Sequence, residues 1–326
     1  MTAPALRGRL APSPTGALHL GNARTFLVTW LSCRAQGGRM LLRVEDLDHP
    51  RVKPHAVAEL YEDLRWLGLD WDEGPDRGGP CGPYVQTERR GLYRQALDRL
   101  RAQGLAYPCT CSRKDAAAAA SAPHAGEEGP RYPGTCRGRW PDYAAAQAAL
   151  PPGRSPAWRL RAADREVCFD DGFHGRQCGN VARSCGDFAF ARAADGAGYQ
   201  LAVVVDDAAM GVTEVVRGDD LLPSTHRQLL LYEALGLPAP RFVHVPLVVG
   251  PDARRLAKRH GDTRLSRVRA AGVRPERVVG LLASWCGWTR RGEELSAADL
   301  VDRFDLGTLP HAPIVYTDAD RAFLGL

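Results

Sequence analysis

The chain has 326 residues, of which 44% are hydrophobic and 25% are charged, so it is long enough for one large or two modest domains with a buried core. No apolar run approaches the ~20 residues that a membrane span needs, and the first residues lack the apolar core of a signal peptide. We therefore expect a cytoplasmic protein without a membrane partner. The formal net charge of +5 permits a polyanionic partner but does not require one.

The first informative segment, PSPTGALHLGN, runs from Pro12 to Asn22. It predicts the end of a short apolar strand, a turn with proline and glycine, and a long helix that opens near Gly21. Such a helix start directs backbone N–H groups and a positive dipole end at a ligand. Gly21 would let a phosphate approach closely, and the imidazole of His19 would donate a hydrogen bond to it. Spacing alone leaves two interpretations open, an ordinary helix start and a phosphate site.

Hydrophobic periodicity predicts further helices that alternate with strands along the chain. Helices are expected at 22–35, at 57–67 before Gly68, at 93–100 with Gly104 as a stop, at 224–235 with Ser224 or Thr225 as cap, and at 275–285. Strands are expected at 40–44, 200–205, 212–216 and 242–249. Several of these strands are continuous β-branched runs, which suit parallel strands buried on both faces. The alternation predicts a doubly wound α/β domain, with a mainly helical region after about residue 260.

Residues 105–157 depart from this pattern, because they contain a cysteine cluster, an alanine tract and a patch rich in glycine and proline. They indicate an insertion that is held together by its own cysteine cluster, rather than a continuation of the sheet. Cys109, Cys111 and Cys136 would supply three thiolates of a tetrahedral zinc site. Chemistry alone nominates His124 as the fourth ligand, because histidine is the commoner donor; a cluster without metal is the alternative. The remaining cysteines are expected to be reduced; they are Cys33, Cys81, Cys168, Cys178, Cys185 and Cys286.

Lys258 lies in the basic segment GPDARRLAKRHGD, directly after the strand expected at 242–249. It is one of only three lysines in the chain. A lysine in a loop at this place can reach a triphosphate and stabilise charge on the reacting phosphorus or on a departing pyrophosphate. An exposed basic loop is the alternative interpretation.

Together these motifs resemble the signatures of the class I aminoacyl-tRNA synthetases, and specifically those of the glutamyl branch. HLGN at 19–22 resembles the first signature, and RLAKR at 255–259 resembles the second. The resemblance extends through RLAPSPTG, LRVEDLD, GYQLAVVVDD and VVRGDDLL, and it covers most of residues 7–260. It implies a Rossmann-like doubly wound parallel sheet with a zinc-binding insertion and a short helical C-terminal region.

The resemblance also implies a division of the chain into four parts. The first half of the catalytic domain is expected at 1–104, and an insertion with the zinc cluster and an acceptor-binding subdomain at 105–190. The second half of the catalytic domain, with the signature loop, is expected at 191–260. Residues 261–326 are expected to form the helical region, without a full anticodon-binding domain.

The same resemblance implies roles for individual residues. The expected glutamate-binding residues are Arg9, Leu10, Ala11, Pro12, Ser13, Glu45, Tyr199 and Arg217. The expected catalytic residues are His19, Gly21, Asn22 and Lys258, of which His19, Gly21 and Lys258 would bind ATP. The guanidinium groups of Arg9 and Arg217 match a carboxylate better than an amide, and Glu45 would hold the α-ammonium group. Ser13 and Tyr199 would add hydroxyl groups.

For the metal, the family pattern favours Tyr132 as the fourth ligand, and His124 stays as the alternative. The implied cofactors are one structural Zn²⁺ per chain and Mg²⁺ that binds with ATP. The second signature departs from the family at two positions, since Arg255 replaces the usual lysine and Ala257 the usual serine. Asn22 replaces the second histidine of the general first signature, as the glutamyl branch commonly tolerates.

Residues 260–326 are few for the anticodon-binding region that follows the second signature in glutamyl-tRNA synthetases. The resemblance is therefore to truncated members of the branch, which attach glutamate to the queuosine base in the anticodon of tRNA(Asp). The expected partners of a monomeric chain are ATP, L-glutamate and tRNA(Asp) carrying queuosine. A truncated enzyme that charges the 3′ end of tRNA is the first alternative. A non-catalytic zinc-containing RNA-binding paralogue is the second, although binding RNA would not require Arg9, Glu45, Tyr199, Arg217 and Lys258 as a set.

Overall fold

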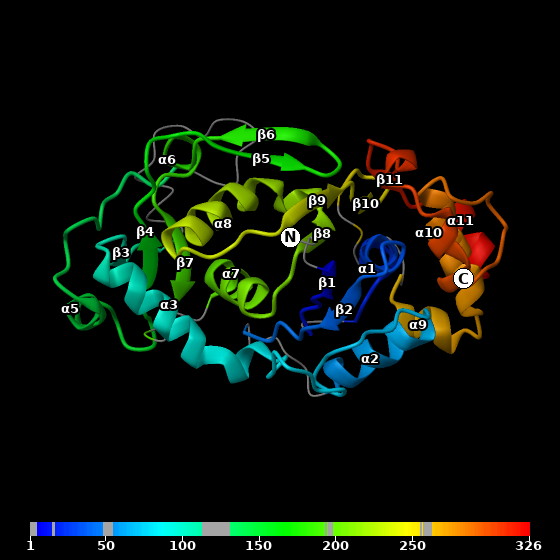
Figure 1. Cartoon of the computed structure of the whole chain (residues 1–326), viewed down its shortest axis with the longest axis horizontal. Helices are drawn as coiled ribbons and strands as arrows, with labels where there is room; N and C mark the ends of the chain where they lie inside the picture. Colours follow the sequence, from blue (N-terminus) through cyan, green and yellow to red (C-terminus); the bar gives the residue numbers. More distant parts are fainter. Residues whose placement is uncertain are drawn as a thin grey trace.

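A parallel sheet forms the centre of the protein (Figure 1), whose computed structural model describes residues 5–14, 17–47, 55–112, 131–192, 194, 198–254, 256 and 263–326. Strand β1 (Arg7–Leu10) pairs in parallel with β2 (Arg39–Leu42), and β8 (Glu214–Gly218) pairs in parallel with β9 (Arg241–Val245). The backbone N–H of Thr213 donates to the carbonyl of Arg7 over 2.9 Å and thereby joins the two pairs. The order across the centre is β2-β1-β8-β9.

A helix connects the strands within each parallel pair, as parallel pairing requires. Helix α1 (Leu20–Arg34) leads from β1 to β2, and α8 (Leu222–Ala234) leads from β8 to β9. All five residues of β8 are buried, including the charged Glu214 and Arg217, as expected for a strand covered on both faces. The predicted α/β class is confirmed by this arrangement.

The helices expected from periodicity are largely present. Helices α2 (Ala56–Trp66), α3 (Arg90–Ala102) and α10 (Pro275–Trp285) lie where the sequence predicted them. The predicted cap of α8 is wrong, because this helix begins at Leu222, before Ser224 and Thr225. Both of those side chains are buried inside the helix, and none of the described side chains caps it.

The strand predicted at 200–205 is also wrong, because these residues belong to helix α7 (Tyr199–Ala209). The run from Leu201 to Val205 is buried throughout, and a helix covered on several sides needs the same unbroken apolar run as a buried strand. The strand predicted at 242–249 is split into β9 and β10 (Val248–Val249). Pro246 lies between them and has no N–H group for a ladder.

The middle of the chain contains more sheet than the sequence indicated. Strands β3 (Ala106–Cys109), β4 (Ala157–Leu160) and β7 (Phe188–Arg192) form an antiparallel sheet, and β5 (Val167–Asp171) and β6 (Gly175–Gly179) form a hairpin. Short helices α5 (Tyr143–Ala148) and α6 (Val181–Ser184) complete this part. The antiparallel sheet lies toward one end of the molecule, and the hairpin extends along α8 toward β9 (Figure 1).

Two cysteines in the hairpin correct a further prediction. Cys168 and Cys178 were expected to be reduced, yet they form a disulfide. They are paired directly across the β5–β6 ladder with their Cα atoms 4.2 Å apart, so the register of the hairpin places the two sulfurs in contact. The separation of ten residues along the chain carries no sign of this register.

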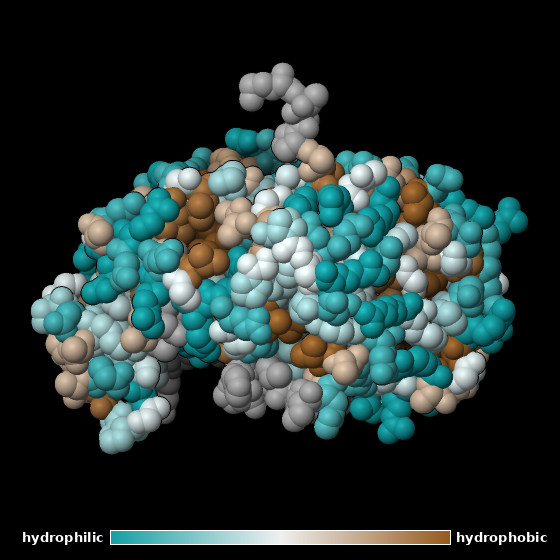
Figure 2. Space-filling view, turned by 60° about the horizontal axis from the view of Figure 1, so that its bottom comes forward, coloured by the Kyte–Doolittle hydropathy of each residue, from teal (hydrophilic) through white to brown (hydrophobic). Residues whose placement is uncertain are grey.

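The C-terminal region is mainly helical, as predicted. It contains α9 (Leu265–Ala270), α10 and α11 (Asp318–Leu324), and its short strand β11 (Ile314–Val315) pairs in parallel with β10. None of the helices in the described part of the chain is both long and apolar enough to cross a membrane. The face drawn in Figure 2 is largely hydrophilic, and its hydrophobic residues form small separate patches.

Candidate active site and metal centre

A cavity of about 550 Å³ opens where β1 and β8 end, the edge at which open α/β sheets bind ligands. It gathers predicted site residues from segments far apart in the sequence. Those that line it are Arg9, Ala11, Pro12, Ser13, His19, Asn22, Glu45, Tyr199 and Arg217. Leu10 does not line it, because its side chain is fully buried in the core. Lys258 lies outside the described residues.

The start of α1 forms one wall of this cavity. His19 is the N-cap, and its Nδ1 atom accepts the backbone N–H of Asn22 over 3.4 Å, while the Asn22 side chain accepts the N–H of His19. With Nδ1 occupied as an acceptor, a neutral imidazole carries its proton on Nε2. Gly21 lies beside a smaller adjoining cavity, and a Cβ there would be 3.2 Å from the His19 ring and 3.5 Å from Val248. Glycine therefore keeps this space open next to the helix start.

Described residues within and after the second signature lie close to the first. Leu20 donates its N–H to the carbonyl of Thr263, and Leu265 donates to the carbonyl of Leu18, over 3.0 and 2.8 Å. On the other side, Leu256 donates to the carbonyl of Val248 over 3.2 Å. Leu256 and Thr263, the described residues on either side of the segment 257–262, therefore both lie close to the start of α1.

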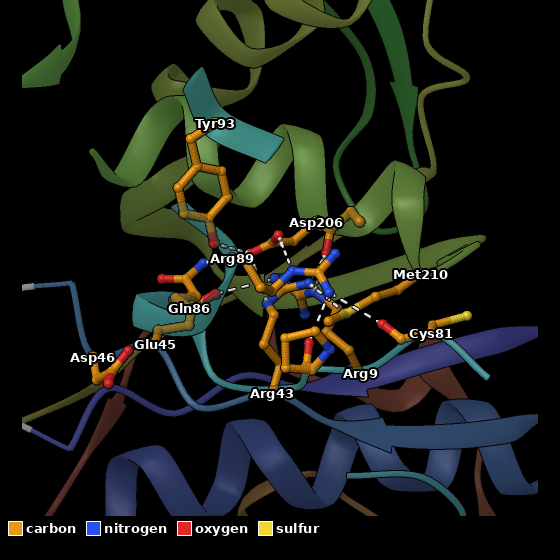
Figure 3. Close-up of polar contacts among 12 residues, drawn as sticks. Arg9, Arg43, Glu45, Asp46, Cys81, Gln86, Arg89, Tyr93, Asp206 and Met210 are labelled. Carbon is orange, nitrogen blue, oxygen red and sulfur yellow. Dashed lines mark hydrogen bonds and ion pairs between the residues drawn. The ribbon is translucent and has the colours of Figure 1, made fainter. Parts of the chain in front are cut away.

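A buried charge cluster supports the cavity from behind (Figure 3). Arg43 is fully buried and donates to Asp207 over 2.6 Å and to Glu45 over 3.1 Å. The same Asp207 lies 3.6 Å from Nε of Arg9. Burial raises the pKa of Glu45, although the positive charges of Arg43 and Arg9 oppose the rise. The cluster therefore joins two cavity residues, Arg9 and Glu45, to one fixed framework.

Asp206, the neighbour of Asp207 on α7, serves as a structural anchor. Its carboxylate accepts hydrogen bonds from Arg89, Tyr93 and Gln86 over 2.6, 2.8 and 2.9 Å (Figure 3). Burial and the negative charge of Asp206 raise the pKa of Tyr93, so this phenol stays a hydrogen-bond donor. These contacts fix α7 against α3.

This framework was not among the residues predicted from the sequence. Arg43 lies inside LRVEDLD, and Asp206 and Asp207 end GYQLAVVVDD, so the signal was present in the quoted motifs. The pairing between the two motifs is a long-range contact, and spacing along the chain does not reveal it.

Arg217 approaches the cavity from the end of β8. Its Nη2 atom donates to Oγ1 of Thr225 over 2.8 Å, and its Nε atom donates to His244 over 3.0 Å. Burial lowers the pKa of Arg217. Tyr199, at the start of α7, lines the same cavity with 41% of its surface exposed, which is unusual for a large aromatic side chain and leaves area for a ligand to cover.

The three clustered cysteines come together as the sequence predicted. The sulfurs of Cys109, Cys111 and Cys136 all lie within 4.8 Å of one another. The phenol oxygen of Tyr132 is 3.3 Å from the sulfur of Cys109 and 3.8 Å from that of Cys111. Three sulfurs and one oxygen around a common centre are a donor set that suits a metal ion. The alternative ligand, His124, lies outside the described residues.

With this geometry in place, comparison with known proteins identifies the class. The family model described as "tRNA synthetases class I (E and Q), catalytic domain" matches residues 5–314. The chain therefore belongs to this family of ligases. Within it, the chain is 54% identical over 310 residues to a glutamyl-Q tRNA(Asp) synthetase from Symbiobacterium thermophilum, and the alignment covers 95% of both chains.

Further relatives agree with this placement. A glutamyl-Q tRNA(Asp) synthetase from Nitratidesulfovibrio vulgaris is 49% identical over 97% of this chain and 96% of its own. Identity and coverage of this size place the chain with the glutamyl-Q tRNA(Asp) synthetases inside the family. Among solved structures, the glutamate-tRNA synthetase of Elizabethkingia anophelis superposes with a TM-score of 0.80 at 28% identity, covering 98% of this chain and 70% of that one.

Proposed function

We propose that this chain activates L-glutamate with ATP and Mg²⁺ without the help of tRNA, and that it transfers the glutamate to the queuosine base in the anticodon of tRNA(Asp). The observation that carries the proposal is the single cavity shared by Arg9, Arg217, Glu45 and the start of α1. It combines groups for both ends of an amino acid with a helix N-terminus suited to phosphate.

The amino-acid half of the cavity suits glutamate. Arg9 and Arg217 offer guanidinium groups to substrate carboxylate, and the carboxylate of Glu45 takes the α-ammonium group. Ser13 and Tyr199 add hydroxyl groups, and the backbone at 10–12 closes the wall beside them. Two arginines near one cavity favour an acidic side chain over an amide.

The nucleotide half begins at α1. His19, Gly21 and Asn22 stand at the helix start, and Lys258 is separated from the anchored Leu256 by one residue. In the first step, an oxygen of the glutamate α-carboxylate attacks the α-phosphorus of ATP, and the bond to the bridging oxygen breaks to release pyrophosphate. His19 and Lys258 stabilise the negative charge that develops on the phosphates, and Mg²⁺ bound with ATP would contribute to the same stabilisation.

The second step transfers the glutamyl group. A hydroxyl of the queuosine cyclopentenediol attacks the activated carbonyl carbon, an ester bond forms, and AMP leaves with the electron pair of the broken bond. The acceptor is inferred from the names of the relatives that match this chain over nearly its whole length. We further infer that the chain acts as a monomer in the cytoplasm.

The cysteine cluster is assigned a structural role. Cys109, Cys111, Cys136 and Tyr132 would hold one Zn²⁺ and so tie β3 to the segment at 132–136. These residues lie outside the cavity described above, so the ion would support the fold of this part of the chain.

The first experiment measures glutamate-dependent exchange of pyrophosphate into ATP without tRNA. We expect exchange with the wild-type chain, loss of at least 100-fold in Lys258→Ala, and no change in the control Lys114→Ala. Exchange that is unchanged in Lys258→Ala would overturn the assignment of this lysine. Mass spectrometry of tRNA(Asp) nucleosides after incubation with ATP and glutamate then identifies the acceptor.

Two alternatives give different results. An enzyme that charges the 3′ end would label tRNA that lacks queuosine, and removal of the 3′-terminal adenosine would abolish the label. A non-catalytic RNA-binding protein would bind tRNA without any exchange. Glutamyl-queuosine formed on tRNA(Asp) that lacks its 3′-terminal adenosine excludes both.

A further inference from the structure

A buried chain of side chains holds Arg217 from behind. Nε of Arg217 donates to Nε2 of His244 over 3.0 Å, and Nδ1 of His244 lies 2.6 Å from Oδ2 of Asp171. The side chains of His244 and Asp171 have no exposed surface. Arg217 and His244 are register partners on β8 and β9, whereas Asp171 ends β5, so these contacts join the cavity to the β5–β6 hairpin.

These contacts fix the tautomer of His244. The Nε atom of Arg217 can only donate, so Nε2 of His244 must accept. The neutral ring then carries its proton on Nδ1 and donates it to Asp171. Burial lowers the pKa of His244, although the bond to Asp171 opposes this, and a lowered pKa favours the neutral ring.

Asp171 is well suited to this role. Its Oδ1 atom accepts the backbone N–H groups of Phe173 and His174 over 2.9 Å each, and the backbone N–H of His244 lies 3.2 Å from both oxygens. Oδ2 faces the ring of His244. Burial opposes ionisation, but the hydrogen bonds from His244, His174 and Phe173 outweigh it and hold the pKa of Asp171 below its usual range. The carboxylate is therefore a fixed acceptor that cannot release the ring into the other tautomer.

The consequence for Arg217 is a fixed charge that has no direct ion pair with any carboxylate of the described residues. Its two contacts above go to neutral acceptors, the His244 ring and the Thr225 hydroxyl. Arg43, by contrast, pairs directly with the carboxylates of Asp207 and Glu45. Nη1 of Arg217 makes no hydrogen bond to the described residues, and the side chain lines the cavity. Its charge is thus kept for a ligand.

We propose that Asp171 and His244 are positioning residues of the amino-acid site, which orient Arg217 and reserve its charge for a carboxylate of the substrate. The inference rests on the proposed function, because it takes glutamate as the ligand. On this proposal, the preference for glutamate over glutamine depends partly on Asp171 and His244, although neither residue touches the bound amino acid.

The test uses Asp171→Asn. Asparagine keeps the Oδ1 acceptor for the backbone N–H groups of Phe173, His174 and His244 but presents an amide N–H₂ to the ring. The ring proton would then move to Nε2, where it opposes the N–H of Arg217. We expect calorimetric titration to show glutamate affinity reduced at least tenfold, ATP affinity unchanged within twofold, and a smaller preference for glutamate over glutamine.

The matched control is Asp170→Asn, one residue away, whose side chain is 77% exposed and pairs with Arg176. It should bind glutamate like the wild type. If the folded Asp171→Asn variant also binds glutamate like the wild type, or loses ATP and glutamate affinity equally, the proposal is overturned. Absence of glutamate binding and of exchange in the wild type would instead overturn the proposed function.

A second pair of variants covers the case in which Asp171→Asn does not fold. His244→Gln retains a side-chain carbonyl that can accept from Arg217, whereas His244→Leu has a similar volume and no acceptor. We expect the glutamine variant to bind glutamate at least tenfold more tightly than the leucine variant, with equal ATP affinity. Equal glutamate affinity in the two variants would contradict the proposal.

Discussion

The guanidinium of Arg43 donates to the carboxylate of Asp207 over 2.6 Å, with the side chains 0% and 4% exposed. Asp207 also lies 3.6 Å from Arg9, so one carboxylate serves both an interior arginine and an arginine of the cavity. Removal of one member of such a buried group leaves the others without compensation, which costs far more than loss of a surface pair. The arrangement couples the stability of the fold to the shape of the site.

Asp207→Asn tests this coupling. We expect a loss of about 3–5 kcal/mol in the free energy of unfolding, as for other broken buried pairs, together with weaker glutamate binding. The control Asp70→Asn removes a carboxylate that is 59% exposed and pairs with Arg34, and it should cost less than about 1 kcal/mol. Urea denaturation measures both. A similar loss in the free energy of unfolding for the two variants would show that Asp207 stabilises the fold no more than a surface carboxylate does.

Glu45→Gln separates binding from stability. The amide keeps an oxygen that can accept from Arg43 but loses the charge for the substrate ammonium group, so glutamate affinity should fall by about 10–100-fold, or roughly 1.4–2.8 kcal/mol. Glu88→Gln, an exposed residue, is the control. Titration calorimetry gives the affinities, and an affinity within twofold of the wild type would exclude Glu45 as the ammonium ligand.

The pH dependence of Glu45 has a defined sign. Burial raises its pKa, so the carboxylate that binds the ammonium group is lost as the pH falls through a value above the ordinary glutamate range. Wild-type affinity for glutamate should decline over that interval, and the profile of Glu45→Gln should be flat there. Stability has the opposite pH dependence to glutamate affinity. The free energy of unfolding of the wild type, relative to that of Glu45→Gln, should fall as the pH rises from the ordinary glutamate pKa of the unfolded chain to the raised pKa of the folded protein.

The sequence predicted the elements that have a strong local signal. The periodicity of 57–67 and of 275–285 marks α2 and α10, and the turn before Gly21 marks the start of α1. The strand expected at 200–205 fails because an unbroken apolar run is common to buried strands and to buried helices. Length and flanking residues did not separate the two.

The sequence pointed to residues of this cavity only where a motif contains them. Arg9, Glu45 and Arg217 lie in quoted motifs and meet in one cavity. Asp171 and His244 were missed, because their relation depends on the hairpin meeting β9, which no local pattern encodes. The register of a hairpin and the partner of a buried charge are properties of the folded chain.

The metal centre offers a test between two ligands. We expect about one zinc ion per chain in the wild type by elemental analysis, loss of zinc in Cys111→Ser, and weakened binding in Tyr132→Phe, since only the phenol oxygen is removed. His124→Ala should retain the metal. Chelation should lower the Tm of the wild type but not of Cys111→Ser. Zinc lost in His124→Ala and kept in Tyr132→Phe would reverse the assignment.

Asp63 on α2 gives a stability effect that is independent of the active site. Its side chain is fully buried, neither of its oxygens has a hydrogen-bond partner in the described structure, and Arg269 lies 3.5 Å away. Burial and the charges of Glu59 and Glu62 raise its pKa to about 7, against the effect of Arg269. The neutral acid therefore fits the folded protein better than the carboxylate does.

Asp63→Asn should remove this dependence on pH. Because the pKa in the folded state lies above that of the unfolded chain, wild-type stability relative to the variant should fall as the pH rises from about 4 to about 7 and then level off. At about 1.4 kcal/mol per pKa unit, the difference reaches at most about 4 kcal/mol. Denaturant titrations at several pH values measure it, with Asp98→Asn, 56% exposed on α3, as the control. If the free energy of unfolding changes with pH in parallel for the wild type and Asp63→Asn, ionisation of Asp63 does not destabilise the folded protein.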